Sequence, residues 1–168
     1  IIKETARILN KLKEEDISCY IIPGSHDFSP SGKTMLDVLE KSGLVENVMK
    51  FEDENLVLTE DKTNAKITGI FGLRGGLDSL YYKKLKVKQE QGFKIFMFHC
   101  SISELVPESL RKYFNFSIDD LPKNFDYYAG GHIHIVKEEK LGEGKIVYPG
   151  PVFPNSFSEL EDLEHGGF

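Results

Sequence analysis

The chain has 168 residues, of which 40% are hydrophobic and 11% aromatic, a composition that supports one folded domain and excludes a disordered tail. Its formal net charge of −6 disfavours a protein that holds nucleic acid by net charge alone, although a local basic stripe or bound cations can still do so. No apolar run approaches the roughly 18 residues of a membrane span and no signal-like segment opens the chain, so we expect a cytoplasmic protein with no membrane partner.

In the first half of the chain, helix and strand patterns alternate. The continuous apolar run over 17–22, ended by Pro23-Gly24, is typical of a buried strand, and the polar segment 60–64 between two β-rich runs predicts a hairpin. The predicted elements are a helix over 1–13, the strand 17–22, a helix from Ser31-Gly32 to Gly43, a strand over 44–49, and hairpin strands over 55–59 and 65–71.

The second half continues this alternation. Residues 93–98 form an apolar run of the kind that is buried on both faces of a sheet, and they lead directly to His99. Residues 125–129 repeat the arrangement and lead to Gly130-Gly131-His132. The predicted elements are a helix over 78–91, the strand 93–98, a partly helical segment over 101–116, the strand 125–129, and hairpin strands over 134–140 and 145–148 around Leu141-Gly142-Glu143-Gly144.

Histidines follow three of the predicted strands. His26 lies in the loop after the first strand, His99 after the strand 93–98, and His132 and His134 after the strand 125–129. Ligands of an open α/β sheet bind at the carboxyl ends of its strands, so three such loops are expected to meet. His132 and His134 are two residues apart and would point to the same side of an extended segment, where they can share a metal site.

This set of side chains predicts a particular chemistry. Neutral imidazoles bind manganese, iron and zinc, whereas magnesium and calcium prefer oxygen ligands. Two such ions, roughly 3.5–4 Å apart, polarise a phosphate diester and generate a hydroxide nucleophile near neutral pH. A nearby histidine could protonate the departing oxygen, and Asp27 could orient the His26 imidazole or hold it protonated. The two cysteines, Cys19 and Cys100, have no C-x-x-C spacing, which argues against a zinc ribbon or a disulfide framework.

The ordered motifs resemble those of the calcineurin-like metallophosphoesterases, which are Gly-Asn-His-Asp/Glu, a lone histidine at a strand end, and Gly-His-x-His. Within that superfamily, the chain resembles the DNA double-strand-break-repair nucleases of the Mre-eleven and SbcD type. The segments that carry the resemblance are Gly24-Ser25-His26-Asp27, His99, the stretch 125–134 with Gly131-His132-Ile133-His134, Tyr148-Pro149-Gly150, Ser156-Phe157-Ser158-Glu159 and Gly166-Gly167-Phe168.

The resemblance implies a layered α/β metallophosphoesterase fold, with β-sheets flanked by helices, that here lacks its N-terminal strands. Residues 1–168 would form the C-terminal portion of the nuclease domain, with 149–168 leading toward a C-terminal capping region. It further implies a DNA exonuclease or endonuclease that uses two divalent ions, most often Mn²⁺. Its implied partners are DNA, an SbcC-like coiled-coil ATPase of the ABC type, and a second copy of the chain.

The resemblance also assigns roles to individual residues. His99, His132 and His134 would bind metal, and His26, beside Asp27, would protonate the leaving sugar oxygen. Ser25 occupies the position of a metal-binding asparagine and is a poorer metal ligand. The family's upstream Asp-x-His and Gly-Asp motifs do not occur in this chain, so alone it is expected to bind metals weakly and to turn over little substrate. Two alternatives stay open, a small-molecule phosphoesterase and a catalytically degenerate scaffold, and no residue is assigned to substrate binding.

Overall fold

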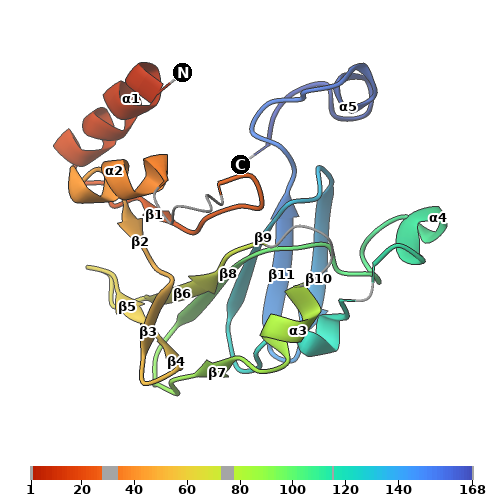
Figure 1. Ribbon diagram of the computed structural model, residues 1–168. Helices are drawn as coiled ribbons and strands as arrows, with labels where there is room; N and C mark the ends of the chain where they lie inside the picture. The colour runs from red at the N-terminus through yellow and green to blue at the C-terminus, as the bar shows by residue number, and fades with distance from the viewer. Residues whose placement is uncertain (1, 28–33, 73–77, 115, 168) are drawn as a thin grey trace.

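The computed structural model describes residues 2–27, 34–72, 78–114 and 116–167 (Figure 1). Helices and strands alternate along the chain, as the sequence predicts. The elements are α1 (Ile2–Glu14), β1 (Tyr20–Ile21), α2 (Met35–Lys41), β2 (Glu46–Asn47), β3 (Lys50–Glu52), β4 (Asn55–Val57), β5 (Thr59–Glu60), β6 (Lys66–Ile70), α3 (Asp78–Tyr82), β7 (Lys86–Val87), β8 (Lys94–His99), α4 (Glu108–Arg111), η2 (Ile118–Asp120), β9 (Tyr127–Gly131), β10 (Val136–Leu141), β11 (Gly144–Pro149) and α5 (Phe157–Leu163).

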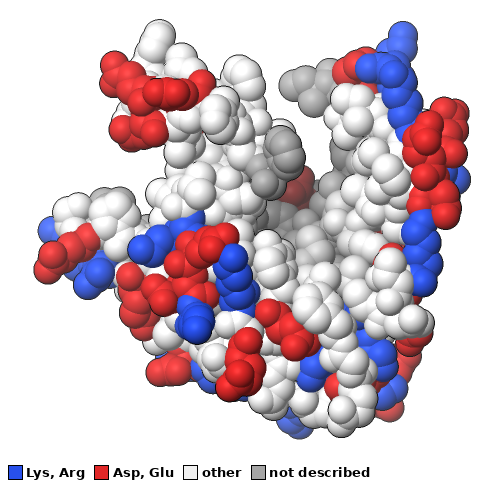
Figure 2. Space-filling view, turned by 180° about the vertical axis from the view of Figure 1, so that it is seen from behind, with Lys and Arg blue, Asp and Glu red and all other residues white. Residues whose placement is uncertain are grey.

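The largest sheet has six strands in the order β10-β11-β9-β8-β6-β5. Its four central strands are parallel, and β5 and β10 pair antiparallel at the two edges. The carboxyl ends of the parallel strands therefore lie along one border of the sheet. The chain continues from β11 to α5, which stands on the opposite side from α1 and α2 (Figure 1). The surface is hollowed between these helices (Figure 2).

Aromatic side chains fill the core beneath this border. Phe96, Phe98, Tyr128 and Tyr148 are at most 1% exposed. The Phe98 and Tyr148 rings meet edge to face, with their centroids 5.4 Å apart. Such contacts add to the burial of apolar area, so they fix the relative positions of β8 and β11.

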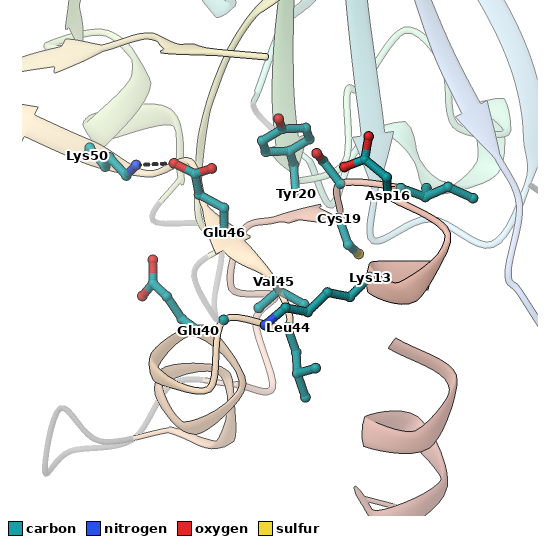
Figure 3. Close-up of a pocket in the computed structure, with 12 residues that line it drawn as sticks. Lys13, Asp16, Cys19, Tyr20, Glu40, Leu44, Val45, Glu46 and Lys50 are labelled. Atoms are coloured by element: carbon teal, nitrogen blue, oxygen red, sulfur yellow. Dashed lines mark hydrogen bonds and ion pairs between the residues drawn. The ribbon is translucent and has the colours of Figure 1, made fainter. Parts of the chain in front are cut away.

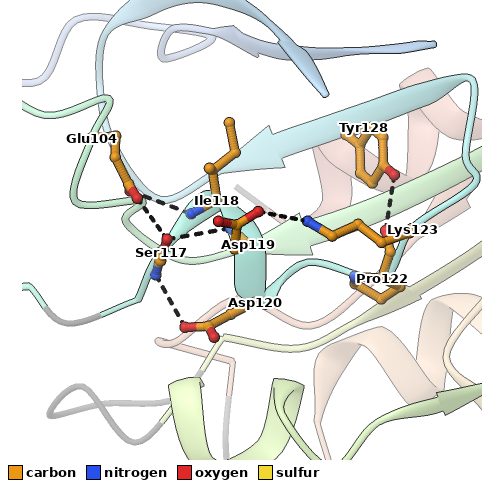
Figure 4. Close-up of polar contacts among 8 residues, drawn as sticks. All are labelled: Glu104, Ser117, Ile118, Asp119, Asp120, Pro122, Lys123 and Tyr128. Carbon is orange, nitrogen blue, oxygen red and sulfur yellow. Dashed lines mark hydrogen bonds and ion pairs between the residues drawn. The ribbon is translucent and has the colours of Figure 1, made fainter. Parts of the chain in front are cut away.

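Polar contacts secure the connection from β8 to β9 (Figure 4). Ser117 and Asp120 form a capping box around η2, and the Glu104 carboxylate accepts a hydrogen bond from the Ser117 hydroxyl at 2.6 Å. The Tyr128 hydroxyl donates to the Pro122 carbonyl at 2.8 Å. These bonds satisfy the polar groups of the loop just before β9 and hold the start of that strand in place.

The predicted helix over 78–91 is wrong beyond its first turns. The helix α3 ends at Tyr82, and Lys86–Val87 form β7, which pairs with β4. Leu85 and Val87 pack against the core, and lysines alternate with them. An apolar residue at every second position is a strand pattern, and the predicted helix did not take it into account.

The other elements differ from prediction mainly in length. The run 55–59 divides between β4, in a three-stranded sheet, and β5, which forms the predicted hairpin with β6. The strand 17–22 is reduced to β1, and the described residues of the segment 101–116 contain only the short helix α4. The predicted helix start at Ser31-Gly32 lies outside the described residues, and the N-cap of α2 is Thr34. Within the described ranges, no helix is long and apolar enough to cross a membrane.

We expect Tyr148→Phe to destabilise the chain by about 1–3 kcal/mol, because it leaves a buried carbonyl without its donor. The Tyr148 hydroxyl donates to the Cys100 carbonyl at 2.8 Å, and both residues are at most 1% exposed. Urea unfolding measures the difference. The matched control is Tyr113→Phe, at a side chain that is 66% exposed, and equal stability of the two variants would contradict this role of Tyr148.

Candidate metal centre

Two of the predicted site histidines meet at the carboxyl border of the sheet. His99 is the last residue of β8 and pairs in register with Gly131, the last residue of β9. His132 follows at once, and its Nδ1 lies 3.3 Å from His99 Nε2. The backbone of His132 has a φ of +88°, which L side chains seldom adopt. The backbone turns directly after β9, and the His132 imidazole lies next to the end of β8.

The His99 ring is packed against backbone from three segments. A Cβ atom added at Gly72 would lie 2.5 Å from His99 Cδ2, one at Gly131 would lie 3.0 Å from Nδ1, and one at Gly24 would lie 3.1 Å from Cε1. Glycine at these positions lets the backbone approach the ring closely. Gly24 and Gly131 belong to the predicted motifs. Gly72 was missed, although its place just after a β-rich run that neighbours β8 was a usable signal.

The surroundings of His99 keep its imidazole neutral. Burial is the main cause that lowers its pKa to about 4, and the neighbouring His132 lowers it further. Asp27 acts in the opposite direction, while His26 and His134 also favour the neutral form. At neutral pH, His99 therefore offers a lone pair to a metal ion. Each of these four side chains is near enough to influence the pKa of His99.

A tight turn holds the segment Gly24-Ser25-His26-Asp27. The Asp27 carboxylate accepts a hydrogen bond from the Gly24 amide at 2.9 Å, and the Asp27 amide donates to the Gly24 carbonyl at 3.2 Å. Ser25 is only 4% exposed, whereas His26 lies at the surface. His26 is therefore exposed to solvent next to the Asp27 carboxylate, which the backbone amide of Gly24 holds in place. That Asp27 orients His26, and that Ser25 binds a metal, stay predictions.

His134 has a different partner from the one expected. The segment after β9 turns at His132 instead of staying extended, so the extended backbone from which a common side was predicted for His132 and His134 is not present. The His134 Nδ1 lies 2.9 Å from Glu159 Oε1. Hydrogen bonds from the Asn155 backbone amide, and then from His134, lower the pKa of Glu159. Glu159 lies in the segment Ser156-Phe157-Ser158-Glu159, for which the sequence predicted no functional role.

The histidine pair fits a transition-metal ion in part. Two imidazole nitrogens that bind one tetrahedral zinc ion at about 2.0–2.1 Å lie about 3.3 Å apart, which is the separation between His99 and His132. In the described part of the chain, no group of three or more histidine, cysteine, aspartate or glutamate side chains is arranged to hold a metal ion. The two imidazoles alone do not make a complete metal site.

Two pockets lie near this end of the molecule. A pocket of 410 Å³ between α1, α2 and β2 is lined by charged side chains that include Lys13, Asp16 and Lys50, and its described lining contains no histidine (Figure 3). A pocket of 250 Å³ is mainly apolar and shares Gly24, Asp27 and Gly72 with the surroundings of His99. Its described lining contains no histidine either, but Gly24 and Gly72 connect it to the contacts of the His99 ring.

Comparison with known proteins gives relatives of one kind. No protein-family model matches the chain. It is 28% identical to the DNA double-strand break repair protein Mre11 of Methanococcus maripaludis, over 95% of this chain and 43% of that protein. It is 32% identical to Mre11 of Sulfurisphaera tokodaii, over 84% of this chain and 35% of that protein. For the double-strand break repair protein mre-11 of Caenorhabditis elegans, the identity is 26%, over 89% and 24%.

The matches cover most of this chain but less than half of each of these relatives. They include a nematode as well as several archaeal proteins, so the similarity is not confined to one group of organisms. Over most of its own length, the chain is therefore Mre11-like, with relatives that are DNA double-strand break repair proteins.

Proposed function

We propose that this chain supplies part of the active site of a metal-dependent DNA nuclease that hydrolyses phosphodiester bonds in double-strand-break repair. The observation that carries the proposal is the 3.3 Å approach of His99 Nε2 and His132 Nδ1 at the carboxyl ends of neighbouring parallel strands. Residues 1–168 would then form the C-terminal portion of a metallophosphoesterase domain. The relatives are DNA double-strand break repair proteins, which favours DNA over a small-molecule phosphoester as the substrate.

His99, His132 and His134 are the proposed metal ligands, with Ser25 at the position of a further one. Two Mn²⁺ ions are the proposed cofactors, and a bound ion of this kind polarises the phosphate and lowers the pKa of a bound water. The protein's own contribution is orientation. The glycine contacts around His99 hold its ring in one position, and its lowered pKa keeps a lone pair available above about pH 4.

His26 is the proposed proton donor. It lies exposed in the turn that Asp27 closes on Gly24, beside the apolar pocket that Asp27 also lines. A substrate in this pocket would bring its leaving sugar oxygen close to the imidazole, which can then transfer a proton to it. Asp27 would orient the imidazole.

A catalytically degenerate scaffold is the second candidate function. Ser25 carries a neutral hydroxyl where the family has asparagine, and the described residues contain two converging metal donors where a complete site needs more. A scaffold of this kind would keep the fold and its partner surfaces without cleaving DNA. Metal titration distinguishes it from the nuclease.

The proposed macromolecular partners are DNA, an SbcC-like ABC-type ATPase and a second copy of the chain. No residue of α1 or α2 is fully buried, and apolar side chains remain exposed on both helices. On α2, Met35 is 45% exposed and Val38 is 52% exposed, at a spacing that places them on one face. This face is the proposed contact between two copies. A cytoplasmic location stays a prediction from the sequence.

In the complete protein, we expect His132→Ala to weaken Mn²⁺ binding and to abolish cleavage of a linear DNA duplex, because it removes one of the two converging donors. His26→Ala should retain Mn²⁺ binding and lose at least about 100-fold in cleavage rate, as expected for a general acid. Isothermal titration with Mn²⁺ and a gel assay of DNA degradation measure the two effects. Exposed His165 provides the control variant. Normal cleavage by His26→Ala would overturn its assignment, and absent Mn²⁺ binding by the unmodified protein would favour the scaffold.

The His99 imidazole is expected to titrate with a midpoint near pH 4 in the metal-free chain. Because its folded-state pKa lies below the ordinary value of 6.5, the unfolded chain takes up this proton first. The stability that depends on neutral His99 is therefore present above about pH 6.5 and is lost as the pH falls toward 4. NMR titration of the imidazole carbon-bound protons measures the midpoint. It should rise in His132→Ala, and an unshifted midpoint in the unmodified chain would contradict the described environment.

Self-association through α2 is expected to depend on its exposed apolar face. Val38→Glu should lower the fraction of dimer in the complete protein, since it places a charge in an apolar contact. Sedimentation velocity measures the change, with Lys137→Glu on the exposed strand β10 as the control for added negative charge. A dimer fraction that is the same in both variants would exclude this face as the contact.

A further inference from the structure

We propose that Glu159 is a positioning residue for the metal centre, which holds the His134 imidazole in the tautomer that offers Nε2 to a metal ion. The inference rests on the proposed function for the identity of the ligand, and it adds a residue and a segment that the motifs do not assign. It starts from the distance of 2.9 Å between Glu159 Oε1 and His134 Nδ1.

The chemistry of the pair determines which ring nitrogen carries the proton. An ionised carboxylate only accepts hydrogen bonds, so a neutral imidazole that contacts it through Nδ1 must carry its hydrogen there. The lone pair of His134 is then on Nε2, at the far side of the ring from Glu159. Metal-binding histidines characteristically donate their second ring N–H to a carboxylate or carbonyl, which fixes both tautomer and orientation.

The carboxylate itself is held in place by local structure. Glu159 Oε2 accepts a hydrogen bond from the Asn155 backbone amide at 2.9 Å, and the Glu159 amide donates to Ser156 Oγ at 3.2 Å. Both bonds lie at the start of α5, where Ser156 is the N-cap. The first turn of α5 therefore leaves Oε1 directed at His134.

Glu159 differs in this respect from the other acidic side chains on α5. The helix has the sequence FSELEDL, and it forms an acidic projection in the space-filling view (Figure 2). Glu161 and Asp162 are exposed, whereas the Glu159 side chain is 21% exposed and faces the β9–β10 connection. The contact is therefore specific to one carboxylate and does not follow from the acidic character of the helix alone.

The two histidines of the Gly131-His132-Ile133-His134 motif would then use opposite ring nitrogens. His132 directs Nδ1 toward His99, while His134 has Nδ1 engaged with Glu159. A motif of two histidines spaced by one residue can reach a metal centre in this way even though the backbone turns at His132. The segment after β11, which carries Glu159, would thereby help to position the metal centre.

The tautomer is measured directly on the 168-residue chain without metal. Long-range ¹⁵N–¹H correlation spectra of the histidine rings at pH 8, above the ordinary imidazole pKa of about 6.5, distinguish a proton on Nδ1 from one on Nε2. We expect His134 to carry its proton on Nδ1 in the unmodified chain and in the control Glu161→Ala. Glu159→Ala should shift the proton toward Nε2, and Glu159→Gln, which keeps an acceptor oxygen, should restore Nδ1 in part.

A second control separates positioning from mere support of α5. Ser156→Ala removes the N-cap oxygen but keeps the carboxylate, so it should loosen the backbone of α5 while the His134 tautomer stays closer to that of the unmodified chain. Backbone amide spectra report whether each variant is folded. The inference is overturned if His134 carries its proton on Nε2 in the unmodified chain, or if Glu159→Ala leaves the tautomer unchanged.

The metal readout is made on the complete protein. Loss of a carboxylate that orients a metal-binding histidine typically weakens metal binding by about 10- to 100-fold, and we expect about 10-fold here because the His134 side chain is 42% exposed. Electron paramagnetic resonance of free Mn²⁺ measures this change in Glu159→Ala against Glu161→Ala. If the unmodified protein binds no Mn²⁺, the proposed function fails, while the tautomer still decides the role of Glu159. Equal Mn²⁺ affinity of Glu159→Ala and Glu161→Ala would contradict the positioning role of Glu159.

Discussion

The packing of one imidazole against backbone is the constraint on which the candidate centre depends. The His99 ring lies so close to Gly24, Gly72 and Gly131 that side chains at those positions would displace it. The three glycines come from the ends of three different segments, so the ring can occupy its place only when these segments have converged. The sheet order, with β8 between β6 and β9, brings two of them to His99 from either side. At this border, the fold and the geometry of the candidate centre therefore depend on the same contacts.

The aromatic core explains how the border keeps its shape. Tyr148 packs its ring on Phe98, one residue before His99, and bonds through its hydroxyl to the carbonyl of Cys100, one residue after it. A single buried side chain from β11 thus contacts the ring of the residue before a proposed metal ligand and the backbone carbonyl of the residue after it. The tyrosine of the Tyr-Pro-Gly stretch therefore has a structural role at this border.

The sequence was most informative where local pattern and tertiary environment agree. The apolar run before His99 is a central strand, and the residues around Leu141-Gly142-Glu143-Gly144 form the expected hairpin. The prediction from sequence failed where local pattern and tertiary environment compete. The stretch after Tyr82 has helix-forming lysines, but its apolar residues alternate with them and form the strand β7. The meeting of His99 and His132 followed from strand order. The pairing of His134 with Glu159 did not, because it joins positions 25 residues apart through a turn at His132 that no local pattern announces.

The edges of the large sheet have a consequence for the behaviour of the chain in solution. A long unpaired strand invites further strands to add to it, and the chain counters this at both borders. At one side β5 is only two residues long. At the other, every residue of β10 except the half-buried Leu141 is exposed, the sequence is Val-Lys-Glu-Glu-Lys-Leu, and Glu138 forms an ion pair with Lys145 of the neighbouring strand at 2.6 Å. Because charges of both signs line this edge strand, it is a poor template for the addition of further strands. The charged edge thus protects the parallel strands from open-ended polymerisation.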